Sequence, residues 1–93
     1  MIKHVYLYRL LPNVNRPEVA EKLKTLQTHV PEIHDMEVAL DFKHTQNSYD
    51  LIESCTFLSM EDFLAFGKNE YHESIRRYMA TVQECGVKID YKV

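Results

Sequence analysis

One acidic residue stands on the apolar side of a predicted strand. Residues 49–58 are rich in apolar and β-branched side chains, and Glu53 alternates there with Leu51 and Cys55, so the three share one face. A carboxylate buried on such a face is unfavourable by several kcal/mol unless it is paired or protonated. We therefore expect Glu53 to have a partner.

Two histidines are the best candidates for that partner. His4 lies on a predicted neighbouring strand and His72 at the start of a predicted helix. Imidazole titrates near pH ~6.5, so either pairing would form a general acid–base couple, with His72 as the proton shuttle and His4 or Glu53 orienting it. Leu23 and Phe66 would be the apolar walls of such a ligand site. The alternatives are a structural histidine–glutamate pair and a glutamate at a dimer seam or in solvent.

Other kinds of chemistry lack their residues. The chain has no glycine-rich phosphate loop, no GxSxG motif and no second histidine to complete HExxH after His72-Glu73. His29, Glu32 and His34 cluster after the first predicted helix, but no further cysteine or histidine lies nearby, so we interpret them as a solvated turn. We expect no metal site and no cofactor.

The composition is that of one globular domain. The chain has 93 residues, 45% hydrophobic and 27% charged, which is enough for one core and too few for two. Its 11 lysines and arginines against 14 acidic residues give a net charge of −3, so we expect no nucleic-acid partner. No apolar run is long enough to span a bilayer and no signal sequence follows Lys3, so we expect no membrane partner and a cytoplasmic location. Cys55 and Cys85 would then be reduced.

Hydrophobic periodicity predicts four strands. Two of them carry apolar side chains on both faces, which is typical of central strands, and two have one apolar and one polar face, as edge strands do. The expected central strands are residues 2–11 and 49–58, and the expected edge strands are residues 36–43 and 87–93.

Helix signals fill the two longer gaps between these strands. Asn15 and Glu18 have the spacing of a capping box, which predicts a helix over residues 16–30. The second gap predicts a short helix over residues 60–66, ended by the glycine that follows, and a longer one over residues 70–86.

The order βαββαβ predicts a ferredoxin-like α+β fold. In this fold four antiparallel strands form one sheet and both helical regions cover the same face. The other face of the central strands is partly apolar and has no cover in a monomer. A second copy of that face is the simplest cover, so we expect a homodimer whose two sheets close into a barrel.

Four short stretches carry a family resemblance. They are the opening Met1-Ile2-Lys3-His4-Val5, the strand over residues 49–57, the run Asn69-Glu70-Tyr71-His72 and the closing Asp90-Tyr91. In combination, and over essentially the whole chain, they resemble the stress-responsive A/B barrel (Dabb) family. The resemblance implies a dimeric α+β barrel with a single domain over residues 1–93.

The resemblance leaves two functions open. The family includes plant stress-associated proteins without clear catalysis and a plant polyketide cyclase that works without a cofactor through two histidines and a tyrosine. The two histidines correspond to His4 and His72, but Phe66 stands at the tyrosine position and has no hydroxyl group. This favours a dimeric module that binds a small ligand or serves in stress without catalysis. The alternative is a cofactor-free cyclase, lyase or monooxygenase that acts on a small, partly apolar substrate with His72 as general acid/base.

Overall fold

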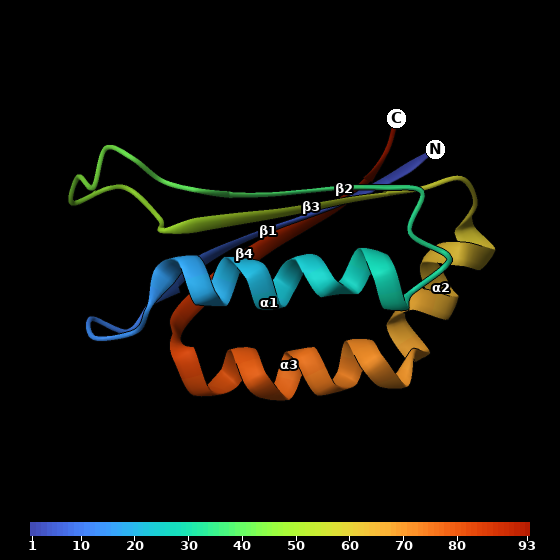
Figure 1. Cartoon of the computed structure of the whole chain (residues 1–93). Coiled ribbons are helices and arrows are strands. Elements are labelled where there is room, and N and C mark those ends of the chain that lie inside the picture. Colours follow the sequence, from blue (N-terminus) through green and yellow to red (C-terminus); the bar gives the residue numbers. More distant parts are fainter.

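The computed structural model describes residues 1–93 as four strands and three helices (Figure 1). The strands form one antiparallel sheet in the order β2-β3-β1-β4, so the two strands with two apolar faces are central and the predicted ferredoxin-like α+β fold is confirmed. The elements are β1 Ile2–Leu10, α1 Arg16–His29, β2 Asp35–Leu40, β3 Leu51–Phe57, α2 Met60–Lys68, α3 Glu70–Val82 and β4 Gln83–Lys92.

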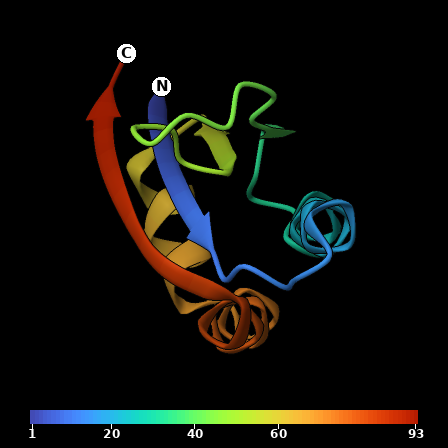
Figure 2. The same ribbon diagram turned by 90° about the vertical axis from the view of Figure 1, so that its left-hand side faces the viewer.

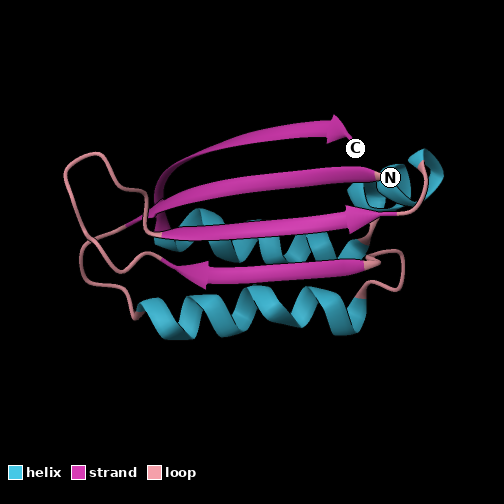
Figure 3. Cartoon of the chain, turned by 90° about the horizontal axis from the view of Figure 1, so that it is seen from above, coloured by secondary structure: helices cyan, strands magenta, loops and turns pink.

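The helices form a single layer against the sheet. In Figure 1, α1 and α3 run side by side beneath one face, and α2 lies at one end of the layer. Viewed end-on, the sheet curves around these helices (Figure 2). The opposite face, seen from above in Figure 3, carries no helix. None of the helices combines the length and hydropathy of a membrane span.

The core lies between the helices and the inward faces of β1 and β3. Because side chains alternate along a strand, the even-numbered residues of β1 and the odd-numbered residues of β3 point to the helices. Cys55 and Phe57 of β3 and Leu23 and Leu26 of α1 belong to this core, and all four are completely buried. Each large apolar side chain buried in this way contributes roughly 1.5–3 kcal/mol.

Two asparagines begin the two longer helices. The Oδ1 atom of Asn15 accepts a hydrogen bond from the backbone N–H of Glu18 at 3.1 Å, as the capping pattern predicted. Asn69 ends α2 and also begins α3, where its Oδ1 atom accepts from the backbone N–H of His72 at 3.0 Å. These bonds satisfy N–H groups that have no partner inside the helix. Asn69 therefore sets the position of His72 directly.

The boundaries of α2 and α3 differ from the sequence prediction. Gly67 does not end α2, which continues to Lys68, because helical backbone is accessible to glycine and only weakly disfavoured. In the other direction, α3 ends at Val82 and β4 already begins at Gln83. The sequence pattern predicts helix up to Gly86, but Gln83 and Cys85 are in a strand because they pair with Leu10 and Arg9 of β1. Long-range pairing overrides local propensity here.

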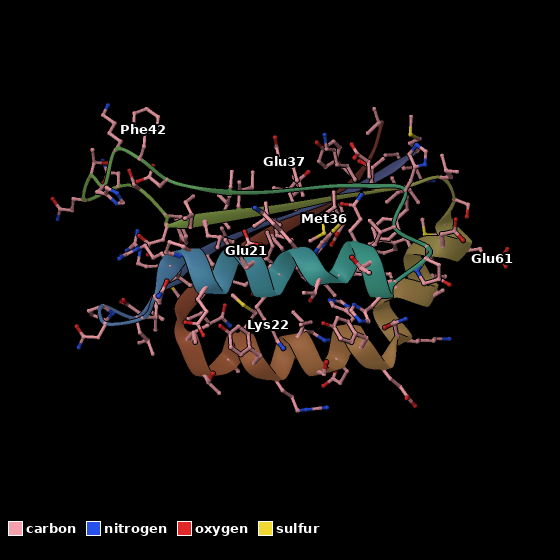
Figure 4. The ribbon with its side chains drawn as sticks, viewed as in Figure 1. Glu21, Lys22, Met36, Glu37, Phe42 and Glu61 are labelled. Carbon is pink, nitrogen blue, oxygen red and sulfur yellow. The ribbon has the colours of Figure 1, made fainter.

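The second strand is shorter than its alternating pattern. β2 ends at Leu40, and Phe42, expected on its apolar face, is 91% exposed in the turn that follows. At the start of β2 the side chains alternate as predicted, since Met36 points toward α1 and Glu37 points away from the helices (Figure 4). Phe42 projects from the far end of the sheet in the same view.

Candidate functional site

A cavity of about 330 Å³ opens between the sheet and the junction of α2 with α3. Helix α1 contributes nothing to it, because α1 packs over the β2 side of the sheet. The lining consists of His4, Tyr6 and Tyr8 from β1, Glu53 from β3, Phe63, Leu64, Phe66, Gly67 and Lys68 from α2, His72 and Arg76 from α3, and Lys88 and Asp90 from β4.

Glu53 is the most buried acidic group of this cavity, with only 2% of the residue exposed. It faces inward because it alternates with Ser54 on β3 and pairs with Tyr6 of β1. The hydroxyl of Tyr8 donates a hydrogen bond to Oε1 at 2.8 Å, and the thiol of Cys55 lies 3.8 Å from Oε2. Burial raises the pKa of Glu53 above its ordinary value, more than these hydrogen bonds lower it. The carboxyl group of Glu53 therefore favours its protonated form more than an exposed glutamate does.

His4 connects this buried acid with the last strand. Its Nδ1 atom lies 2.5 Å from Oδ1 of Asp90, and because a carboxylate can only accept, Nδ1 carries the proton. Its Nε2 atom lies 3.9 Å from Oε2 of Glu53, which is beyond hydrogen-bond distance. The strand register explains the arrangement, since Asp90 is the direct cross-strand neighbour of His4.

His72 is a neutral base on the opposite wall. Its Nδ1–H donates to the backbone carbonyl of Phe66 at 2.9 Å, and its ring stacks on the Phe66 ring at a centroid distance of 3.8 Å. Burial lowers the pKa of His72 to about 4, and the charge of Arg76 acts in the same direction. The Nε2 atom makes no hydrogen bond within the chain. At neutral pH it therefore offers a free lone pair that can accept a hydrogen bond or a proton.

Four of the five residues singled out in the sequence meet in this cavity. His4, Glu53, Phe66 and His72 line it together, although their part in binding or catalysis stays a prediction. Leu23 does not line it, since this residue is completely buried in the core on α1. Of the two histidines expected to pair with Glu53, His4 lies within ion-pair distance at 3.9 Å. The hydrogen bond to the carboxyl group comes from Tyr8, and His72 bonds to the Phe66 carbonyl instead.

Six polar residues of the lining were not among the predicted site residues, namely Tyr6, Tyr8, Lys68, Arg76, Lys88 and Asp90. Tyr8 lies on the same face of β1 as His4, so strand alternation alone could have found it. Lys88 and Asp90 face inward only because β4 pairs with β1 in the register Lys88–Tyr6 and Asp90–His4. That register is a long-range property, and the apolar residues that alternate with them point to the uncovered face.

Comparisons with known proteins agree on one family and one fold. The family model described as Stress Responsive A/B Barrel Domain matches residues 2–93. No curated protein matches the chain significantly.

Among solved structures, a protein from Arabidopsis thaliana is 19% identical with a TM-score of 0.86, over 100% of this chain and 95% of that chain. Hydroxynitrile lyase from Passiflora edulis is 17% identical with a TM-score of 0.86, over 99% and 92%. A dimeric ferredoxin-like protein of unknown function from Thermobifida fusca is 20% identical with a TM-score of 0.85, over 99% and 90%. At these identities the likeness is one of fold.

Proposed function

Because this chain belongs to the stress-responsive A/B barrel (Dabb) family, we propose that it binds a small, partly apolar molecule in the cavity beside His72, as one half of a homodimer. The observation that carries the proposal is the composition of the lining. Aromatic rings of Tyr6, Phe63 and Phe66 provide apolar walls, and Glu53 and His72 provide convergent polar groups. Apolar walls with a few placed polar groups are typical of small-molecule sites.

The size of the cavity limits the ligand. A volume of about 330 Å³ lies near the lower end of the range of about 300–1,000 Å³ that is usual for ligand sites. It corresponds to the space of about ten water molecules at roughly 30 Å³ each. We therefore expect a ligand of about ten non-hydrogen atoms.

The homodimer is proposed from the uncovered face of the sheet. Leu7 lies there between its cross-strand neighbours Ile52 and Val87, and Val5 lies beside Ile89. Val87 and Ile89 are 48% and 59% exposed, so the single chain leaves a connected apolar surface in water. Structural neighbours from Bacteroides fragilis and Thermobifida fusca are described as dimeric, which supports the same assembly here.

Leu7→Lys tests this face. We expect the variant to dissociate or to unfold, because burying an ammonium group in the apolar interface is strongly unfavourable. Light scattering measures the mass and circular dichroism the fold. Met60→Lys places the same charge on a residue of α2 that is 45% exposed and should leave both unchanged. If Leu7→Lys remains a dimer with the melting temperature of the wild type, the dimer interface does not lie on this face.

A second function is favoured by one pair of groups. His72 offers an unprotonated Nε2 atom, while Glu53 is a buried carboxyl group whose pKa is raised by burial, and both line the same cavity. A base and an acid on two walls can remove a proton from a bound molecule and return one to its developing oxyanion. We propose this cofactor-free proton transfer, of cyclase or lyase type, as the alternative to binding alone. Phe66 argues against the tyrosine-dependent version of that chemistry.

A fragment screen distinguishes the two functions. Protein with ¹⁵N and ¹³C labels is titrated with molecules of about ten non-hydrogen atoms, and we expect binders to shift the signals of His72, Glu53 and Phe66. If the protein only binds, His72→Gln changes affinity and no binder is converted. If it is an enzyme, a binder is converted by the wild type and by His34→Gln, an exposed control, but not by His72→Gln. A screen without any binder that stabilises the wild type would overturn both functions.

A further inference from the structure

The cavity has a charge opposite to that of the chain. Lys68, Arg76 and Lys88 contribute three cationic groups to its lining, against one exposed carboxylate, Asp90. The chain as a whole carries a net charge of −3. Positive groups beside low-dielectric walls concentrate anions at such an opening.

Two of these cations have no partner within the chain. Arg76 is bound by Glu73, whose Oε2 atom accepts from Nε at 3.0 Å and from an Nη atom at 2.5 Å. Asp90 is bound by His4. By contrast, neither Lys68 nor Lys88 makes an ion pair or a side-chain hydrogen bond. Their ammonium groups are the free charges of the cavity.

These lysines stand on different walls, next to its aromatic side chains. Lys68 is the last residue of α2, two positions after Phe66. Lys88 is the cross-strand neighbour of Tyr6 on β4. Both are exposed, so an ammonium group can meet an anion at the mouth without being taken out of water. A ligand with its anionic group there would place its apolar part against the rings.

The inner end of the site offers acceptors. A smaller hollow of about 140 Å³ shares Tyr8, Glu53 and His72 with the cavity and extends it to Gln83. The side-chain oxygen of Gln83 is buried and has no hydrogen-bond partner. A buried acceptor without a partner is rare and unfavourable, and a hydroxyl group of a ligand would satisfy it. The free Nε2 atom of His72 is a second acceptor that lines the same hollow.

We propose that the ligand is a small hydroxy acid, whose carboxylate lies between Lys68 and Lys88 and whose hydroxyl group points to His72 and Gln83. The apolar body, of aryl or short alkyl type, lies between these ends against Tyr6 and Phe66. The inference rests on the proposed function, since it names the chemical class of molecule that the cavity takes. It specifies that the ligand is an anion and states how the ligand is oriented in the cavity.

The test compares matched molecules rather than unknown metabolites. 4-Hydroxybenzoate, its neutral amide 4-hydroxybenzamide, and benzoate are each titrated into the full chain by NMR at pH 7 and 50 mM salt. Two lysines that each strengthen binding a few-fold give roughly a tenfold preference for the acid over the amide. Benzoate should bind several-fold more weakly than 4-hydroxybenzoate, since it leaves the inner acceptors unpaired. Raising the salt concentration should weaken the binding of the acid and leave the binding of the amide unchanged.

Substitutions assign the preference to the two lysines. In Lys68→Met/Lys88→Met the apolar stems are kept and only the charges are lost, so we expect acid and amide to bind equally and the melting temperature to stay the same. Lys92→Met is the control, because Lys92 lies on the same strand and face as Lys88 but does not line the cavity. It should keep the tenfold preference.

The outcomes separate this inference from the proposed function. Equal binding of acid and amide by the wild type overturns the hydroxy acid and leaves the small-molecule site standing. A preference that survives in the double variant overturns the role of the lysines. If the wild type binds none of the three molecules, the hydroxy-acid inference is overturned, and the fragment screen alone decides the proposed function.

Discussion

Replacing His72 by glutamine should remove part of the acid sensitivity of the fold. The pKa of His72 is lowered from 6.5 to about 4 by burial, so the folded chain resists a proton that the unfolded chain accepts. Where the unfolded state binds more protons, stability rises with pH. The wild type should therefore lose stability as the pH falls from about 6.5 to about 4, and His72→Gln should not show this loss.

The size of the effect follows from the two pKa values. One pKa unit corresponds to about 1.4 kcal/mol, so the full difference between 6.5 and about 4 sets a limit of about 3 kcal/mol. Between pH 7 and pH 5 the unfolded histidine takes up most of its proton while the folded one takes up little, which amounts to about 2 kcal/mol. Glu53 acts in the opposite sense, because its raised pKa lowers stability as the pH rises, but it is present in both proteins and cancels in the comparison.

Urea denaturation at fixed protein concentration provides the measurement. The free energy of unfolding is determined at pH 7, 6 and 5 for the wild type, for His72→Gln and for His34→Gln, which removes an exposed histidine. The difference between His72→Gln and the wild type should move by about 2 kcal/mol in favour of the variant between pH 7 and pH 5. The His34→Gln difference should stay flat. If the difference in free energy of unfolding between His72→Gln and the wild type does not change with pH, His72 is not a buried, neutral histidine. It would then also not be the base of the proposed proton transfer.

Three further outcomes are expected. Gly86→Ala should lower the free energy of unfolding by about 1–3 kcal/mol in urea, since the new Cβ would overlap the Tyr6 ring and lie 3.1 Å from a backbone oxygen; unchanged stability would mean that the ring is not packed there. Gly67→Ala should raise it by about 0.5–1 kcal/mol, because nothing lies within 4 Å and alanine favours the helix; a loss would contradict the open space. Cys55 should react far more slowly than Cys85 with a chromogenic thiol reagent, because the first is fully buried, which raises its pKa, and the second is exposed. Equal rates that become no faster in denaturant would be inconsistent with this burial.

The parts of the fold that the sequence predicts correctly are those set by local patterns. Alternation over β1 and β3 identifies the central strands, and Asn15 identifies the start of α1, because these features depend on neighbours along the chain. The inward direction of His4 and Glu53 follows from the same alternation. Their meeting with His72 then follows from the topology.

The errors concern residues whose places depend on distant partners. Residues 83–86 continue a helical pattern, yet they pair with β1 because an edge of that central strand would otherwise have unpaired backbone groups. Leu23 lies on the correct face of α1, but the pattern does not reveal that α1 covers the β2 side of the sheet, away from the cavity. Asp90 faces inward only through the register of β4 against β1. A single sequence contains no signal for these three arrangements.

The contact between His4 and Asp90 joins residues 86 positions apart. The two sides of the site are therefore synthesised at different times. At synthesis rates of about 5–20 residues per second, β1 leaves the ribosome roughly 4 to 17 s before the strand that completes its cavity. During that interval β3 can already pair with one edge of β1, while the partner of the other edge, β4, and its residues in the cavity lining are missing. The proposed ligand site is therefore complete only when the last strand has paired. A bound molecule would stabilise the closing step of biogenesis and none of the earlier ones.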